Sequence, residues 1–163
     1  MQIAIIYDTR TNNTEKAARF IREGCESVDG VEAQIFNIKD AENDYVKTSD
    51  GVIIGCPTYM ASATGAMVEW LQTAGQRVNL AGKLGGAFAT EQYIHGGAEN
   101  VITTILTHEL TFGMMVYSGG NAFDYPCIHL GPVGMRQNLD DFHDLFFIYG
   151  QRFAEQVRRI SHS

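Results

Sequence analysis

The sequence predicts an α/β protein of one domain, in which helices cover both faces of a five-stranded parallel sheet. Short apolar runs rich in β-branched residues alternate with longer segments of helical periodicity. The runs are apolar at successive positions, as in strands buried on both faces. The 163 residues, 45% hydrophobic and 19% charged, suit a single core. Because crossovers between parallel strands are right-handed, few topologies remain, and we expect a three-layer, doubly wound fold with strand order 2-1-3-4-5 over residues 1–163.

The amino-terminal half predicts three strands and two helices. Ile3–Tyr7 reads IAIIY and Gly51–Gly55 reads GVIIG, both typical of strands buried on both faces. Val31–Ile38 alternates apolar and polar residues, as a strand nearer the sheet edge does. Helices are expected over Thr14–Cys25 and Gly65–Gly75, where apolar residues recur at helical spacing. A short link without a helix is expected between the second and third strands.

The carboxyl-terminal half predicts two further strands and two helices. Leu84–Ala89 reads LGGAFA, a strand whose glycines permit close approach of a helix or ligand. Met114–Tyr117 is the fifth strand candidate, and Asp140–Ile160 is the closing helix. The helix over Ala98–Phe112 is expected to bury one apolar side, made of Val101, Ile102, Ile105, Leu106 and Leu110. The segment Gly119–Asn138 is the least regular, and a loop of that length is usually functional or an interface.

Composition and charge argue against several classes of function. The net charge is −7, and the sequence has no basic cluster beyond Arg158–Arg159, which disfavours binding to nucleic acid or to anionic lipid. No apolar run approaches the ~20 residues of a membrane span, and the first residues lack the basic region of a signal peptide. Cys25, Cys56 and Cys127 are too far apart for a disulfide framework or a zinc site. We expect a cytoplasmic protein without a metal.

Ligands of open parallel sheets bind beyond the carboxyl ends of the strands, which selects three loops here. The first loop follows the first strand and supplies three Thr hydroxyls, two Asn amides and one Arg directly before a helix. The free N–H groups and the dipole of that helix end favour an anion, which predicts a phosphate site. The alternative is that Thr11 or Asn13 merely caps the helix, which explains one polar residue and not six. The predicted contacts are Thr9, Arg10, Thr11, Asn12, Asn13 and Thr14.

The second and third loops bring aromatic and polar groups to the same edge of the sheet. Tyr59 offers a face for stacking and Met60 a polarisable surface, although a loop tyrosine can also simply cover the core. In the third loop, Gly96 and Gly97 let backbone approach a ligand, or the segment is only a helix entrance with Glu99 in the first turn. The predicted contacts are Pro57, Thr58, Tyr59, Met60, Thr90, Glu91, Gln92, Tyr93, Gly96 and Gly97.

These motifs together resemble a known family. Thr9–Thr14 resembles the [ST]-x-T-G-x-T phosphate loop of flavodoxins, with Asn12 in place of Gly, a mild departure because Asn tolerates left-handed backbone. Gly55–Tyr59 reads GCPTY, and its GxPTY pattern is similar to the one in flavin-dependent quinone reductases. His95–Glu99, taken with Phe112–Met114, resembles the WrbA branch of NAD(P)H:quinone oxidoreductases and the NADPH-dependent FMN reductases. The resemblance covers residues 1 to about 120.

The resemblance implies a flavodoxin-like fold with FMN bound by the three loops, and an enzyme that passes electrons from NAD(P)H to a quinone or similar acceptor. Because the flavin performs the hydride chemistry, no dedicated acid or base is required. His95 and His129 are the candidates for orienting or protonating a quinone. We also expect a homo-oligomer, a dimer or a tetramer. Because long irregular loops are usually functional or interfaces, Gly119–Asn138 is expected to touch a second subunit or the outer face of the ring.

The alternative is a flavodoxin that carries electrons between redox proteins. Two features favour the enzyme. Met60 stands where many flavodoxins have Gly, and its Cβ makes the backbone conformation that favours one-electron-reduced flavin costlier. Glu91 is the acidic residue that the third loop offers near the ring, whereas flavodoxins usually surround the ring with acids.

Overall fold

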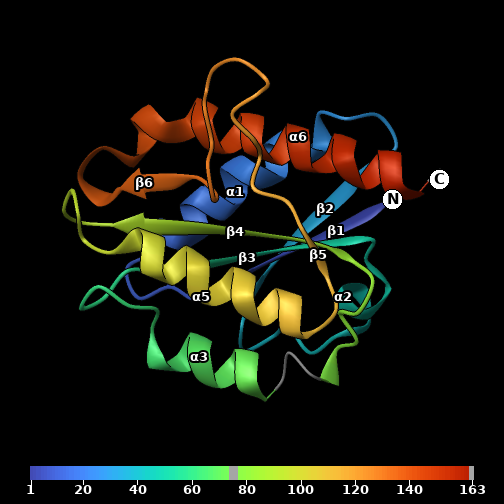
Figure 1. The fold of residues 1–163 in the computed structure, drawn as a ribbon, viewed down its shortest axis with the longest axis horizontal. Coiled ribbons are helices and arrows are strands. Elements are labelled where there is room, and N and C mark those ends of the chain that lie inside the picture. Colours follow the sequence, from blue (N-terminus) through green and yellow to red (C-terminus); the bar gives the residue numbers. More distant parts are fainter. Residues whose placement is uncertain (74–76, 162–163) are drawn as a thin grey trace.

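Parallel strands form the middle layer of the molecule (Figure 1). The computed structural model describes residues 1–73 and 77–161. The strands are β1 (Gln2–Tyr7), β2 (Glu32–Asn37), β3 (Gly51–Pro57), β4 (Leu84–Glu91), β5 (Met115–Val116) and β6 (Val133–Met135). Their order is β2-β1-β3-β4-β5, with β6 also paired to β4. The predicted order 2-1-3-4-5 and the doubly wound α/β class are confirmed.

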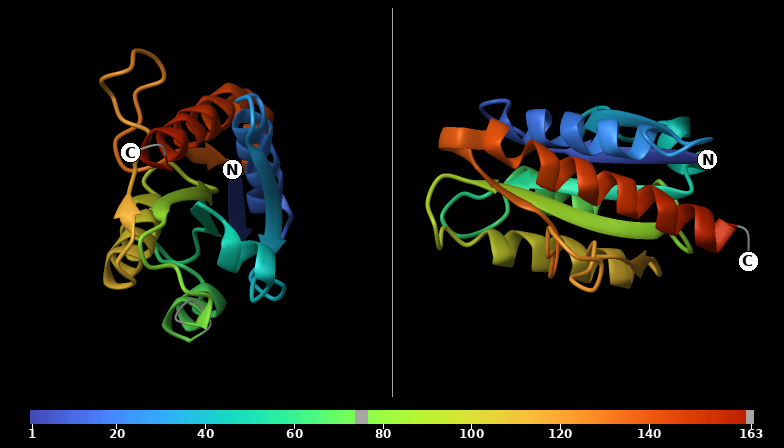
Figure 2. Two further views of the ribbon diagram at one scale, coloured as in Figure 1. Left: turned by 90° about the vertical axis from the view of Figure 1, so that its right-hand side faces the viewer. Right: turned by 90° about the horizontal axis from the view of Figure 1, so that it is seen from above.

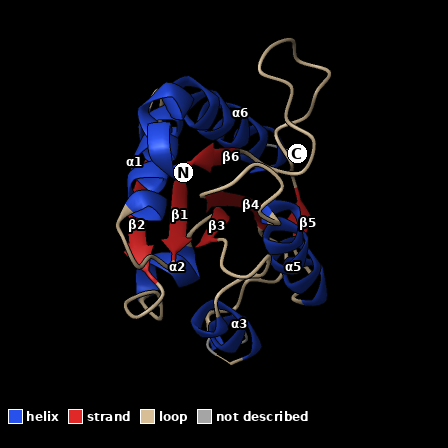
Figure 3. Cartoon of the chain, turned by 90° about the vertical axis from the view of Figure 1, so that its left-hand side faces the viewer, coloured by secondary structure: helices blue, strands red, loops and turns tan. Residues whose placement is uncertain are grey.

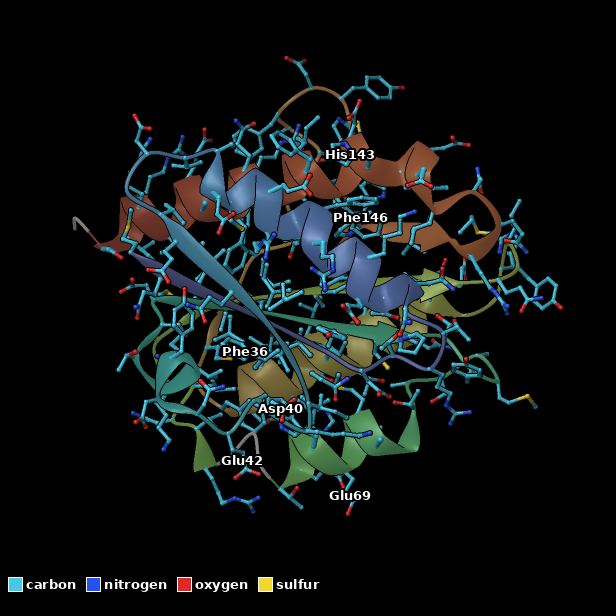
Figure 4. The ribbon with its side chains drawn as sticks, turned by 180° about the vertical axis from the view of Figure 1, so that it is seen from behind. Phe36, Asp40, Glu42, Glu69, His143 and Phe146 are labelled. Atoms are coloured by element: carbon cyan, nitrogen blue, oxygen red, sulfur yellow. The ribbon has the colours of Figure 1, made fainter. Side chains whose placement is uncertain are left out.

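Helices cover both faces of the sheet. They are α1 (Asn13–Glu26), α2 (Asp44–Thr48), α3 (Gly65–Gln72), α5 (Ala98–Thr111) and α6 (His143–Ser161), with a 3₁₀ segment, η1, over Arg136–Phe142. One layer holds α1 and α6, and the other holds α3 and α5 (Figures 1 and 2). Seen from behind, Phe146 on α6 lies on one side of the sheet and Phe36 of β2 on the other (Figure 4). Among the described residues, no helix is long and apolar enough to span a membrane.

The two central strands are apolar throughout because they supply both cores. Ile5 and Ile53, paired across β1 and β3, face the α1/α6 layer, while Ile6 and Ile54 face the α3/α5 layer. All four are 0% exposed. Each fully buried side chain of this size contributes about 1.5–3 kcal/mol relative to exposure. The predicted burial of β1 and β3 on both faces is confirmed. This burial holds the central strands in place, and the loops that follow them lie at the carboxyl edge of the sheet.

Helix α5 buries a different residue from the one that its apolar pattern predicts. Leu110 was assigned to the buried side, but it is 56% exposed, whereas Glu109 is fully buried. The helix begins at Ala98 and has about 3.6 residues per turn, so the residue four positions after Ile105 is the one on the inner face. Burial raises the pKa of the Glu109 carboxyl well above its ordinary value, against a weaker opposing effect of the Gly86 backbone. The folded protein therefore favours the protonated, uncharged form of this acid.

The glycine pair of β4 allows close approach of both helical layers. A Cβ at Gly85 would lie 2.7 Å from Glu109 Oε2 on α5, and a Cβ at Gly86 would collide with Tyr149 Oη on α6. The sequence-based expectation that these glycines admit a close neighbour is confirmed for helices. Their small size therefore sets how tightly α5 and α6 pack on the strand that leads to the third loop.

The outer edge of the sheet is split into two short strands. Val116 of β5 pairs with Gly85, and Val133 of β6 pairs with Ala89. While β4 advances four residues between these pairs, the edge chain advances seventeen, so an insertion interrupts the fifth strand. The predicted fifth strand is thus shorter than Met114–Tyr117, and β6 lies inside the segment expected to be irregular. It escaped prediction because a three-residue strand centred on Gly134 has little β propensity.

The inserted loop projects from the body of the molecule, in orange in Figures 1 and 2. Arg152 of α6 holds its base. The guanidinium is largely buried and donates hydrogen bonds of 2.7–3.5 Å to the backbone carbonyls of Gly119, Gly120, Phe123, Asp124, Tyr125 and Pro126. Because one side chain organises the carbonyls of this segment, the loop has a defined path although it contains no helix or strand.

Other element boundaries differ modestly from the prediction. The expected short link contains the five-residue helix α2, whose N-cap is the Asn43 side chain, accepting from Val46 N at 3.0 Å. The closing helix does not begin at Asp140, because η1 kinks at Asn138 and α6 starts at His143. Helix α3 begins at Gly65 as predicted, and Gly75, its predicted end, lies outside the described residues.

Candidate functional site

A cavity of about 300 Å³ opens at the carboxyl ends of the strands, the end that faces the viewer in Figure 3. This volume is at the lower limit of ligand sites in proteins. The loops after β1, β3 and β4 form its walls, together with one residue from the β6–η1 junction. It is lined by Thr11, Asn13, Thr14, Pro57, Thr58, Tyr59, Met60, Ala61, Thr90, Glu91, Gln92, Tyr93, Gly96 and Arg136.

The first loop leaves the start of α1 open. The N-cap residue is Asn12, in left-handed conformation with φ 64°, and no side chain of the described residues caps the helix. Thr11 Oγ1 instead accepts from Asn13 Nδ2 at 3.0 Å. The alternative that Thr11 or Asn13 serves as a simple cap is therefore wrong. The free N–H groups and the helix dipole remain available to an anion.

Two threonine hydroxyls at this edge are buried without a partner. Thr9 Oγ1 and Thr58 Oγ1 make no hydrogen bond with any part of the chain that the structure describes. Leaving a buried hydroxyl unsatisfied costs about 1–3 kcal/mol, which a ligand oxygen would recover. Nearby, Thr14 Oγ1 and Thr90 Oγ1 lie 2.9 Å apart and tie the first loop to the end of β4. Hydroxyl donors beside an open helix end fit a phosphate group.

The exit from β1 is fixed by a buried contact with the start of α3. Thr64 Oγ1 donates to Asp8 Oδ2 at 2.5 Å and accepts from Met67 N at 3.2 Å, so one hydroxyl caps α3 and holds the loop. Cys56 lies beside it, fully buried, with Thr64 N donating to its Sγ at 3.4 Å. Burial raises the pKa of the Cys56 thiol to about 11, so the group stays protonated at neutral pH and is structural.

The second loop forms a tight turn over Tyr59–Ser62. Tyr59 N donates to Ser62 O, and Ser62 N donates to Tyr59 O, both at 3.0 Å. Its central residues are Met60 and Ala61, with φ of 51° and 57°. The Arg10 guanidinium lies over the Tyr59 ring, 4.4 Å from its centroid. Tyr59 therefore borders the cavity and contacts the first loop, and does not act as a cover for the core.

The third loop is held from both of its ends. Ala98 N, at the start of α5, donates to Glu91 Oε2 at 3.3 Å, so Glu91 and not Glu99 serves this helix end. Gln137 Nε2 donates to the Gln92 carbonyl at 2.6 Å, and Arg136 Nη1 donates to Gln92 Oε1 at 3.4 Å. The β6–η1 junction is thus part of the site. Sequence reasoning missed Arg136 because its position depends on β6 pairing with β4, which no local pattern signals.

The structure brings most of the predicted contacts together. The exceptions among the cofactor-binding residues are Thr9, Arg10, Asn12 and Gly97, which adjoin the cavity without lining it. Ala61 and Arg136 line it and were not predicted. His95 is exposed and lies outside the lining, next to Gly96. His129 lines a separate cavity of about 320 Å³ together with Cys127, so the two histidines do not share a site.

The described residues bring together no group of three or more His, Cys, Asp or Glu that could hold a metal ion. The cavity instead offers hydroxyls, amides, two tyrosine rings, one carboxylate and one guanidinium. Such a set has the chemistry to bind a ligand that carries both an anionic group and a flat ring system.

Comparison with known proteins gives a consistent result. Residues 5–93 match the flavodoxin family model. The chain is 37% identical to a flavodoxin from Clostridium saccharobutylicum, over 98% of this chain and 99% of that one. It is 27% identical to an NAD(P)H dehydrogenase (quinone) from Acidithiobacillus ferrooxidans, over 71% of this chain and 69% of that one.

Solved structures share the fold. A flavodoxin, WrbA-like protein from Agrobacterium tumefaciens superposes with a TM-score of 0.80 at 18% identity, covering 97% of this chain and 98% of that one. A Fusobacterium nucleatum flavodoxin bound to flavin mononucleotide gives a TM-score of 0.66 at 17% identity, covering 99% and 97%. At these identities the likeness concerns the fold alone.

Proposed function

The chain belongs to the flavodoxin family, and we propose that it binds FMN and carries electrons between redox proteins, with residues 1–163 acting as one domain. The similarity to a flavodoxin extends over nearly the whole of both chains at 37% identity. The similarity to a quinone dehydrogenase is lower and covers a smaller share of each chain. The expectation of a quinone-reducing enzyme is therefore the weaker of the two functions that the sequence suggested.

The observation that carries the proposal is the pair of buried, unpartnered hydroxyls on the loops after β1 and β3, together with the open start of α1. Thr9 and Thr58 would donate to the FMN phosphate, with Thr11, Asn13 and the first N–H groups of α1 around it. Hydrogen bonds to a charged group are worth about 1.5–3 kcal/mol each, more than neutral ones. The phosphate end thus supplies much of the binding free energy in this proposal.

The other walls of the cavity suit the flavin ring. Tyr59 and Met60 come from one loop, and Gln92 and Tyr93 from another. Bound FMN would supply the reversible uptake of electrons, while these residues orient the ring and exclude water from it. Transfer between proteins requires neither a general acid nor a general base, so His95 and His129 have no role in this proposal.

The rim of the cavity suits contact with another protein. Met60, Tyr93 and Ile94 are 98%, 67% and 79% exposed, and they lie on the two loops that would border the ring. Exposed apolar side chains gathered at one site are typical of interaction surfaces. A redox protein docked on this rim would approach the ring without crossing the sheet.

A second candidate function is reduction of a quinone-like acceptor by NAD(P)H. Two cations favour it, because Arg136 lines the cavity and Arg10 lies over Tyr59, and both would attract an anionic nucleotide donor.

Two measurements separate these functions. Fluorescence titration of the cofactor-free protein should show one FMN bound per chain. The holoprotein with NADPH and benzoquinone should then show negligible turnover until a flavodoxin reductase is added, because a carrier receives electrons from a protein. Turnover with NADPH alone at rates ordinary for enzymes would contradict the carrier function and favour the second candidate.

A further inference from the structure

The Tyr59–Ser62 turn holds a conformation that its residues do not favour. Met60 and Ala61 both have φ near +55°, in the left-handed region that is unfavourable for residues with a Cβ. Such backbone persists only where the surrounding structure holds it in place. The turn borders the cavity, since Tyr59, Met60 and Ala61 all line it. The contacts that maintain the turn therefore bear on the ligand.

The first turn of α5 supplies these contacts. Asn100 Nδ2 donates to the Ala61 carbonyl at 3.2 Å. Three residues earlier, the backbone of Gly97 touches the turn so closely that a Cβ there would lie 2.6 Å from Ala61 Cα and Cβ. Gly97 has φ 99° and accepts from Asn100 N at 3.0 Å, which sets the two residues side by side. The start of helix α5 thus contacts the turn through the side-chain amide of Asn100 and the backbone of Gly97.

We propose that Asn100 is a positioning residue for the flavin ring. It holds the Tyr59–Ser62 turn in its left-handed conformation through the Ala61 carbonyl, while Gly97 provides the space for this approach. Arg10, stacked on Tyr59, steadies the opposite end of the turn. Asn100 is exposed and does not line the cavity, so it acts only through the turn. This inference rests on the proposed binding of FMN.

The inference predicts an effect on the ring side of the ligand and none on the phosphate side. Riboflavin, which has the same ring and no phosphate, separates the two. Loss of the Asn100 hydrogen bond should weaken the binding of FMN and of riboflavin by the same factor, because the turn borders the ring. Loss of a hydroxyl in the phosphate site should weaken the binding of FMN alone.

The experiment compares Asn100→Ala and Asn100→Asp with Glu99→Ala as the matched control. Glu99 is the exposed neighbour in the same helical turn. Asp keeps the shape of Asn but has no donor for the Ala61 carbonyl. Both Asn100 variants should raise the Kd for FMN and riboflavin about 3- to 10-fold, the effect of one net hydrogen bond. Their visible circular dichroism at saturating flavin should differ from wild type, and Glu99→Ala should match wild type in both measurements.

Gly97→Ala tests the same contact from the other side. An added Cβ would displace Ala61 and would itself be strained at φ 99°. The variant should bind riboflavin and FMN more weakly by a common factor. Combined with Asn100→Ala, its effect on Kd should be smaller than the product of the single effects, because both changes release the same turn.

The outcomes distinguish this inference from the proposed function. Wild-type protein that binds neither flavin would overturn the proposed function, and the inference with it. Wild-type protein that binds FMN, together with Asn100 variants of unchanged Kd and unchanged dichroism, would overturn the inference alone. Asn100 variants that bind FMN more weakly but riboflavin as well as wild type does would also overturn the inference, since the effect would then lie at the phosphate.

Discussion

Thr9 and Thr58 come from different loops, yet their hydroxyls share one unusual state at the same edge of the sheet. Both are buried, and neither has a partner among residues 1–73 and 77–161. In folded proteins a ligand or an ordered water completes such groups, and the open start of α1 favours an anionic ligand. The polar run of the first loop was recognisable in the sequence because its residues are consecutive. The unpaired state was not, since it depends on what surrounds each hydroxyl in space.

Replacement of these hydroxyls by methyl groups should separate ligand binding from stability. Thr9→Val and Thr58→Val should each raise the Kd for FMN about 10- to 100-fold, the range for a hydrogen bond to a charged group. Because each change removes an unsatisfied buried polar atom, the cofactor-free protein should keep or increase its Tm. Isothermal calorimetry and thermal unfolding measure the two effects. Thr103→Val, an exposed site on α5, serves as the control, and unchanged FMN binding in both site variants would place the phosphate elsewhere.

At the scale of elements, α5 illustrates what an apolar pattern can and cannot predict. The helix and its inner residues Val101, Ile102 and Ile105 follow from periodicity. The pattern then favours Leu110, because a buried acid is improbable on composition alone, but helical geometry places Glu109 inward. The split of the edge strand into β5 and β6 was not predicted for a similar reason. Both strands are defined by their pairing with β4 and not by their own residues.

The buried acid on α5 makes stability depend on pH. In the unfolded chain the carboxyl titrates near pH 4.3, about its ordinary pKa. In the folded chain the raised pKa of Glu109 keeps the proton bound to higher pH. The unfolded state therefore binds fewer protons in this window, and the free energy of unfolding falls as pH rises toward the folded pKa. Full stability from this group is present below about pH 4.3.

Glu109→Gln removes this titration while keeping the shape of the side chain. The variant should gain stability relative to wild type as pH rises from 5 to 8, measured by urea unfolding across that range. Glu99→Gln, an exposed change on the same helix, should show no such trend. A constant stability difference between Glu109→Gln and wild type from pH 5 to 8 would mean that Glu109 is ionised in the folded protein.

At the scale of the whole molecule, the sequence determines the layers and the location of the site with few ambiguities. Buried strands such as Ile3–Tyr7 require a parallel sheet, and a parallel sheet places its loops at one edge. Which of two functions the same edge serves does not follow from the loops alone. Met60 and the scarcity of acidic residues in the third loop suggested an enzyme, whereas similarity to a flavodoxin over nearly the whole chain favours an electron carrier. Arg136 lies at the site because β6, which follows the inserted loop, pairs with β4, and this pairing could not be predicted from the sequence.

The proposed binding of FMN requires its phosphate to lie at the open start of α1, and a crystal structure of the protein with FMN would show whether it does. Phosphate oxygens should lie within hydrogen-bond distance of Thr9 Oγ1, Thr58 Oγ1 and the first N–H groups of α1, with the ring between the second and third loops. FMN bound at the amino-terminal edge of the sheet, or with its phosphate in solvent and both hydroxyls still unpaired, would contradict it.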